Sequence, residues 1–120
     1  MQAALISHDR LKPSFVAWVV RHRAALQPHV LFATGTTGGL IKEACPELDL
    51  TPLKSGPLGG DQQIGAMLAE GRIDALFFFI DPLTPMPHDV DVKALIRLTA
   101  LYNVPTALNE ATADRVIAGF

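Results

Sequence analysis

The sequence contains a single cysteine, Cys45, among its 120 residues. One cysteine excludes an internal disulfide framework and a metal site built from a cysteine cluster. It fits the reducing environment of the cytoplasm. The first nine residues show neither the charged start nor the long apolar segment of a signal peptide, so we expect a cytoplasmic protein.

The sequence also lacks a large excess of charge of one sign, and it has no long apolar run. Ten Lys and Arg residues against 12 Asp and Glu residues leave a net charge of −2, which offers no attraction for nucleic acid or anionic membranes. The longest purely apolar run, residues 75–80, is too short to span a bilayer. We therefore expect no nucleic-acid and no membrane partner.

The chain has enough hydrophobic residues to build one core. These residues make up 49% of the sequence, and its mean hydropathy is +0.28. That content predicts a single domain over residues 1–120. It is also slightly apolar for a small monomer, which indicates that some apolar surface is buried in a homo-oligomer.

Short apolar runs alternate with amphipathic patterns along the whole chain. Five such alternations predict an α/β fold, a three-layer α/β/α arrangement around a mostly parallel five-stranded sheet. The continuous apolar run at 75–80 is typical of a strand buried on both faces. The expected strands are 3–7, 29–33, 50–54, 75–80 and 106–108, and the expected helices are 13–25, 37–44, 62–70, 89–102 and 111–118.

The most informative segment is the glycine-rich loop at residues 55–63, which reads Ser-Gly-Pro-Leu-Gly-Gly-Asp-Gln-Gln. Glycines let backbone N–H groups approach a ligand, and the helix that follows offers further N–H groups and its positive end. Such a loop can hold an anion next to the carboxylate of Asp61. In the alternative interpretation Asp61 is only the N-cap of the helix, which would weaken it as a base.

Other polar side chains follow the remaining strands, where ligands bind in open parallel sheets. Hydroxyls and N–H groups at helix starts suit phosphate oxygens, lysine supplies a positive charge, and a carboxylate with imidazoles suits proton transfer beside a carbonyl. Less specific interpretations stay open: helix caps at Thr36 or Thr37, ordinary loop histidines, a turn at Asp81, and a salt-bridged face formed by Asp89, Lys93 and Arg97. The residues in question are His8, Asp9, Lys12, Thr34, Gly35, Thr36, Thr37, Ser55, Gly56, Asp81, His88, Asp89 and Asp91.

Five segments together resemble the methylglyoxal synthase family. They are residues 8–12, 33–38, 55–63, 81–83 and 87–95, each placed after an expected strand. The resemblance implies conversion of dihydroxyacetone phosphate into methylglyoxal and inorganic phosphate, with no metal and no organic cofactor. It also implies a homohexamer, in which inorganic phosphate is a product and a possible inhibitor.

The resemblance further implies roles for individual residues. Asp61 matches the family's catalytic acid/base, and His88 matches the histidine that polarises the substrate carbonyl. Substrate and phosphate binding fall to His8, Lys12, Thr34, Gly35, Thr36, Thr37, Ser55 and Gly56. Supporting positions are Asp9, Asp81, Asp91 and Arg97.

Two departures from the family and two alternative functions accompany this interpretation. Longer family members carry a basic residue in a C-terminal extension, and Leu108 stands where threonine is usual in the family. The sequence therefore does not decide whether this protein senses phosphate between subunits as the family does. One alternative function is a non-catalytic, phosphate-ligand-sensing domain of the same fold. The other is an activity like that of triose phosphate isomerase, which shares the enediolate but retains the phosphate.

Overall fold

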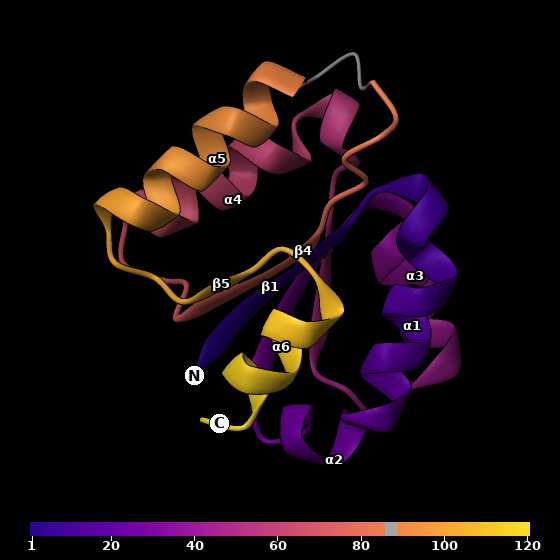
Figure 1. Ribbon diagram of the computed structural model, residues 1–120. Helices are drawn as coiled ribbons and strands as arrows, with labels where there is room; N and C mark the ends of the chain where they lie inside the picture. The colour runs from indigo at the N-terminus through magenta and orange to yellow at the C-terminus, as the bar shows by residue number, and fades with distance from the viewer. Residues whose placement is uncertain (86–88) are drawn as a thin grey trace.

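The computed structural model describes residues 1–85 and 89–120, and within them five parallel strands form one sheet (Figure 1). The strand order is β3-β2-β1-β4-β5, and every pair of neighbours is parallel. The predicted parallel sheet is therefore confirmed. The strands are β1 (Gln2–Ser7), β2 (Val30–Thr34), β3 (Leu50–Leu53), β4 (Ala75–Phe79) and β5 (Thr106–Ala107).

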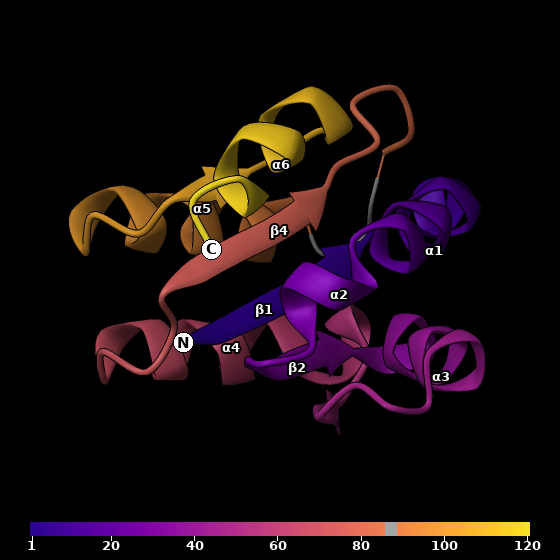
Figure 2. The same ribbon diagram turned by 90° about the horizontal axis from the view of Figure 1, so that it is seen from below.

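Helices cover both faces of this sheet, as Figures 1 and 2 show. One face carries α1 (Lys12–Arg21), α2 (Arg23–Leu26), α3 (Gly35–Ala44) and α6 (Glu110–Ile117). The other face carries α4 (Gly60–Ala69) and α5 (Asp89–Leu101). Short 3-10 helices η1 (Asp9–Leu11) and η2 (Gly56–Leu58) follow β1 and β3. The predicted three-layer α/β/α fold is thus confirmed.

Alternation along the central strands separates the core into two clusters. Leu5 of β1 packs with Trp18 and Phe77 under α1, whereas the next residue, Ile6, packs with Ile64 on the α4 side. Successive side chains of a strand point to opposite faces, so a strand covered on both sides must be apolar at every position. This explains the uninterrupted apolar run that marks β4.

The strand order places a topological switch point beside β1. The chain runs from β1 outward to β2 and β3, then crosses to the other side of β1 to form β4. Ser7 is paired with Phe79, so the carboxyl ends of β1 and β4 are level, and the His8 N–H donates to the Phe79 carbonyl at 3.1 Å. Open α/β sheets bind their ligands at this kind of crevice.

One predicted helix is wrong in extent. The segment 13–25 forms two helices, α1 and α2, because the backbone leaves the helical region at His22, with φ −108° and ψ 16°. The His22 ring lies against Trp18, with centroids 4.7 Å apart, and its Nε2 is 3.4 Å from Asp114 Oδ1. All other element boundaries agree with the prediction to within two residues.

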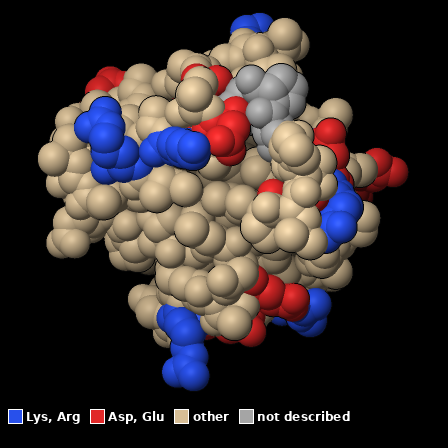
Figure 3. Space-filling view, turned by 45° about the horizontal axis from the view of Figure 1, so that its top comes forward, with Lys and Arg blue, Asp and Glu red and all other residues tan. Residues whose placement is uncertain are grey.

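The surface shows charges of both signs. On the face seen in Figure 3, Lys and Arg side chains alternate with Asp and Glu side chains over a largely uncharged surface. None of the helices in the described part of the chain has the length and apolar character needed to cross a bilayer.

Candidate active site

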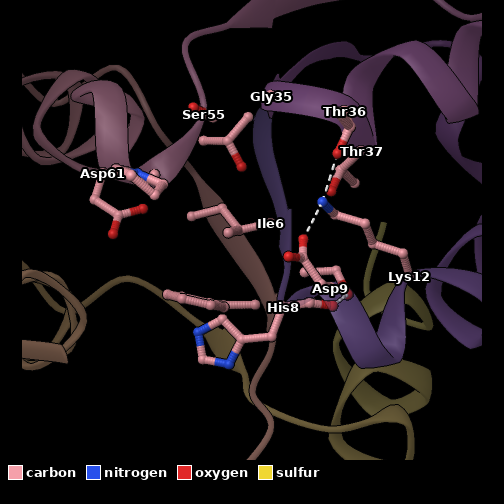
Figure 4. A pocket seen from close by; sticks show the side chains of 14 residues that line it. Ile6, His8, Asp9, Lys12, Gly35, Thr36, Thr37, Ser55 and Asp61 are labelled. Carbon is pink, nitrogen blue, oxygen red and sulfur yellow. Dashed lines mark hydrogen bonds and ion pairs between the residues drawn. The ribbon is translucent and has the colours of Figure 1, made fainter. Parts of the chain in front are cut away.

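A cavity of about 200 Å³ opens at the carboxyl ends of β1, β2 and β3 (Figure 4). It collects most of the predicted site residues, although they come from three separate segments of the chain. Phe78 of β4 and Ile6 of β1 add apolar surface. The lining consists of Ile6, Ser7, His8, Asp9, Lys12, Thr34, Gly35, Thr36, Thr37, Ser55, Gly56, Pro57, Asp61 and Phe78.

The first turn of α3 forms one wall of the cavity. Thr34 is the N-cap residue of this helix, so the alternative in which Thr36 or Thr37 serves as the cap is wrong. The N–H groups of a helix's first turn have no acceptor within the helix and favour an anion. The Thr37 hydroxyl is fully buried, and no described residue gives its Oγ1 a hydrogen-bond partner. A buried hydroxyl in that state is stabilised by any ligand oxygen that bonds to it.

Gly35 brings two of the binding loops together. Its φ is +49°, and a Cβ at this position would lie 2.9 Å from both Cα and Cβ of Ser55. Only a residue without a side chain fits this backbone conformation and this approach. The Ser55–Gly56 loop therefore sits directly against the start of α3, where both can contact one phosphate group.

Lys12 supplies the positive charge of the cavity. Among the described residues it is the one Lys or Arg in the lining, and its side chain is only 16% exposed. Its Nζ donates to Asp9 Oδ1 and to Thr36 Oγ1, both at 2.5 Å (Figure 4). The ammonium is thus held beside the Thr36 hydroxyl of α3.

Asp61 lies across the cavity from Lys12 (Figure 4). It is the second residue of α4 and is 3% exposed. The N-cap position belongs to Gly59, whose φ is +107°, so the alternative in which Asp61 is the N-cap residue is wrong. The carboxylate is held at the cavity by the helix start itself, a rigid element.

A close approach at Gly60 places the start of α4. A Cβ there would lie 2.0 Å from the carbonyl oxygen of Lys54 and 2.9 Å from Thr34 Cγ2. Two hydrogen bonds fasten the same turn: Gly60 N–H donates to the Ser55 carbonyl at 2.8 Å, and Lys54 N–H donates to Gln63 Oε1 at 2.8 Å. Asp61 is consequently fixed relative to the ends of β2 and β3.

His8 forms the wall on the β1 side and is buried. Its Nδ1 accepts a hydrogen bond from the backbone N–H of Asp81 at 2.9 Å. The ring meets Phe78 edge-on, with centroids 5.2 Å apart and an interplanar angle of 84°. Both contacts restrict the orientation of the imidazole.

Asp81 stands behind His8 and outside the lining of the cavity. A hydrogen bond from the Thr84 side chain, one from the Leu83 N–H at 3.1 Å and the nearby Arg10 guanidinium hold the pKa of the Asp81 carboxyl below its ordinary value, against the opposing effect of burial. Arg10 Nε is 3.3 Å from Asp81 Oδ2. The expected turn at Asp81 is present, and the same residue also contacts His8.

The remaining predicted residues that the structure describes lie apart from the cavity. Asp91 lines a separate groove between α4 and α5 that also reaches Asp61. Arg97 is exposed on α5 and lines neither hollow. The expected ion pair between Asp89 Oδ2 and Lys93 Nζ is present at 3.4 Å. His88 lies outside the described residues.

Sequence reasoning missed two residues that shape the site, Arg10 and Gly60. Arg10 follows β1 immediately, and this position at a strand end was the available signal. Gly60 stood in the glycine-rich loop, but its close contact depends on how β3 and α4 meet. Within the described part of the chain, no three His, Cys, Asp or Glu side chains are grouped as a metal site would need.

Comparisons with known proteins agree with this geometry. A family model described as "MGS-like domain" matches residues 14–108. The methylglyoxal synthase of Rhizobium rhizogenes is 63% identical over 114 residues, which cover 95% of this chain and 90% of that protein. The methylglyoxal synthase of Brucella ovis is 58% identical over 117 residues, with 98% and 94% covered.

A solved structure agrees as well. The crystal structure of methylglyoxal synthase from Elizabethkingia anophelis NUHP1 superposes with a TM-score of 0.90 at 48% identity, covering 98% of this chain and 76% of that one. These relatives bear the name of the enzyme, which favours the synthase over the sensing domain and over the isomerase-like activity. The chain therefore belongs to the MGS-like domain family, and the predicted resemblance to the methylglyoxal synthases is confirmed.

Proposed function

We propose that this protein is a lyase that converts dihydroxyacetone phosphate into methylglyoxal and inorganic phosphate. The observation that carries the proposal is the composition of one cavity, where the buried carboxylate of Asp61 faces a cluster of hydroxyls and the ammonium of Lys12. Relatives named methylglyoxal synthase, 58% and 63% identical over nearly the whole chain, support it.

In the proposed complex the substrate's phosphate lies on the α3 side of the cavity. Lys12 neutralises part of its charge, and the hydroxyls of Thr36, Thr37 and Ser55 bond to its oxygens. N–H groups at the start of α3, including that of Gly35, add further donors. The other proposed contributors to this pocket are Thr34 and Gly56.

Asp61 then acts as the base. It takes a proton from the hydroxymethyl carbon, and the electron pair of that C–H bond forms the double bond of an enediolate. Hydrogen-bond donors at the carbonyl oxygen stabilise the negative charge. We assign the role of hydrogen-bond donor to the carbonyl oxygen to His8 and, from the family resemblance, to His88.

Phosphate leaves in the next step. The O–H proton of the terminal hydroxyl passes to the neighbouring enediolate oxygen, and the terminal carbon becomes an aldehyde carbonyl. A new double bond forms towards the carbon that bears the phosphate, and the C–O bond to phosphate breaks. The enol product takes up a proton on that carbon, loses the proton of its hydroxyl and becomes methylglyoxal. The reaction consumes one dihydroxyacetone phosphate and yields one methylglyoxal and one phosphate, and no step requires an oxidant or a reductant.

A matched pair of variants tests the role of Asp61. In Asp61→Asn the amide cannot take the proton, so phosphate release should fall by about 10²–10⁴-fold or more. The control is Asp49→Asn, which changes an exposed carboxylate outside the cavity lining and should leave the rate unchanged. Near-normal turnover of Asp61→Asn would contradict the assignment.

Further parts of the proposal rest on the family resemblance. We infer a cytoplasmic homohexamer that phosphate inhibits, with Asp9, Asp91 and Arg97 in supporting roles. Exposed apolar side chains around the site, at Leu58 and Leu83, would be covered in such an assembly. Light scattering on the purified protein measures the assembly size, and a monomer at micromolar concentration would contradict the hexamer.

A further inference from the structure

His8 forms a partition between two hollows. On one side it lines the cavity that also holds Asp61, and on the other it lines a hollow of about 310 Å³ formed by residues 80–85 and Asp89. The ring is buried, so its protonation state depends on the groups that touch it.

The contact at Nδ1 determines which nitrogen carries the proton. A backbone N–H can only donate, so the bond of 2.9 Å from Asp81 N–H requires a lone pair on His8 Nδ1. The imidazole is therefore neutral, with its proton on Nε2. This nitrogen points towards the side of the cavity on which Asp61 lies (Figure 4). In this form His8 presents an N–H donor.

Arg10 holds the turn that provides this contact. Its Nε lies 3.3 Å from Asp81 Oδ2, while Asp81 Oδ1 accepts the Leu83 N–H at 3.1 Å. Arg10 belongs to η1, two residues after His8, and Asp81 follows β4, so the ion pair joins the ends of two neighbouring strands. The Asp81 carboxylate is ionised at neutral pH, because its bonds to Thr84, to Leu83 and to Arg10 lower its pKa.

We propose that the Arg10–Asp81 ion pair is a positioning device that keeps His8 neutral, with its proton on Nε2. Among the residues that the structure describes, the charged groups on the cavity side of His8 are Asp9, Lys12 and Asp61, and those on the other side are Asp89 and Asp81, which pairs with Arg10. Carboxylates on both sides favour a protonated ring, and the Asp81 N–H at Nδ1 opposes that protonation. A neutral ring donates to the carbonyl oxygen of the substrate without giving up a proton to Asp61.

The catalytic use of this tautomer rests on the proposed function, whereas the tautomer itself does not. Long-range proton–nitrogen correlation spectra of the imidazole rings read it directly, with the His8 signals identified by their loss in His8→Asn. We expect Nδ1 of His8 to have the shift of an unprotonated nitrogen and Nε2 that of a protonated one, from about pH 6 to pH 8. A His8 that is a cation over this range, or that carries its proton on Nδ1, would overturn the proposal.

The Arg10→Ala variant tests the ion pair. The Arg10 side chain is 64% exposed, so its removal should leave the fold intact. We expect His8 to populate a second tautomer or a cation, and kcat to fall by roughly tenfold with a smaller change in KM. Arg10→Lys should restore part of both readouts, because it keeps the charge at this position. The control Arg115→Ala removes an exposed arginine from α6, far along the chain from the site.

The two proposals fail in different ways. If Arg10→Ala leaves the His8 nitrogen shifts and kcat unchanged, the positioning role is wrong even though the enzyme is active. If the wild-type protein shows the expected shifts and Arg10→Ala disturbs them, the positioning role holds even where dihydroxyacetone phosphate releases no phosphate. In that second case it is the proposed function that fails.

Discussion

Replacement of Gly60 by alanine disturbs the placement of Asp61 without altering any charged or hydrogen-bonding group. The new Cβ would lie 2.0 Å from the Lys54 carbonyl oxygen, 2.9 Å from the Lys54 carbonyl carbon and 2.9 Å from Thr34 Cγ2. Two of these atoms belong to the backbone at the end of β3, and they cannot move aside as a flexible side chain can. The first turn of α4 must therefore move away from the sheet.

The size of that movement follows from the contact distances. A carbon atom packs at about 3.5 Å from a non-bonded neighbour, so the turn has to withdraw by more than about 1 Å. Asp61 is the next residue and moves with the turn. Misplacing a reacting group by about 1 Å costs on the order of a hundredfold in rate. Overpacking of this kind also lowers the free energy of unfolding by about 1–3 kcal/mol.

Steady-state phosphate release and urea denaturation measure the two effects. We expect kcat of Gly60→Ala to fall roughly a hundredfold, in a protein that stays folded at room temperature. The matched control is Gly39→Ala in α3, where an added Cβ meets nothing within 4 Å. This control should gain about 0.5–1 kcal/mol of stability and keep its activity. A Gly60→Ala enzyme with kcat within twofold of wild type would refute the argument that this close approach places Asp61.

Three further substitutions give distinct results. Lys12→Ala removes the one Lys or Arg that the described part of the chain contributes to the cavity lining. It should raise KM for the phosphorylated substrate much more than it lowers kcat; unchanged KM and kcat would remove Lys12 from the site. Thr37→Val deletes a buried hydroxyl to which no described residue forms a hydrogen bond. It should therefore raise the free energy of unfolding by about 1–3 kcal/mol while weakening substrate binding. A variant that loses both stability and substrate affinity would contradict this. The Asp81 carboxyl has a pKa below its ordinary value of 3.8, so its contribution to stability is complete above that pH and is lost as the pH falls through the lowered value. The stability difference between wild type and Asp81→Asn should therefore be constant near neutrality and should shrink only below about pH 4; a difference that changes between pH 6 and pH 8 would contradict this assignment.

Local patterns were sufficient to predict the layers of the fold. The apolar run of β4 indicates burial on both faces, and the amphipathic pattern of α5 indicates one buried face, without reference to distant residues. The break at His22 was not predictable in this way. It coincides with contacts to Trp18 in the preceding helix and to Asp114 in α6, and the latter lies far along the chain.

In the site, too, some features follow from local sequence patterns and others depend on contacts between distant residues. Glycines, hydroxyls and Asp61 could be assigned to it because strand ends of a parallel sheet meet at one edge. The bond from Asp81 N–H to His8 Nδ1 joins residues 73 positions apart and depends on the register between β1 and β4. The proximity of Gly60 to Lys54 likewise depends on tertiary structure. The role of His88 stays a prediction from the resemblance.

The most direct test of the proposed function follows the fate of the phosphate. Purified protein is incubated with dihydroxyacetone phosphate, and the reaction is monitored by phosphorus and proton NMR until the substrate is consumed. We expect inorganic phosphate and methylglyoxal to appear in equal amounts, each equal to the substrate consumed. Accumulation of glyceraldehyde phosphate with the phosphate ester intact, or a substrate signal that does not change, would contradict the proposal.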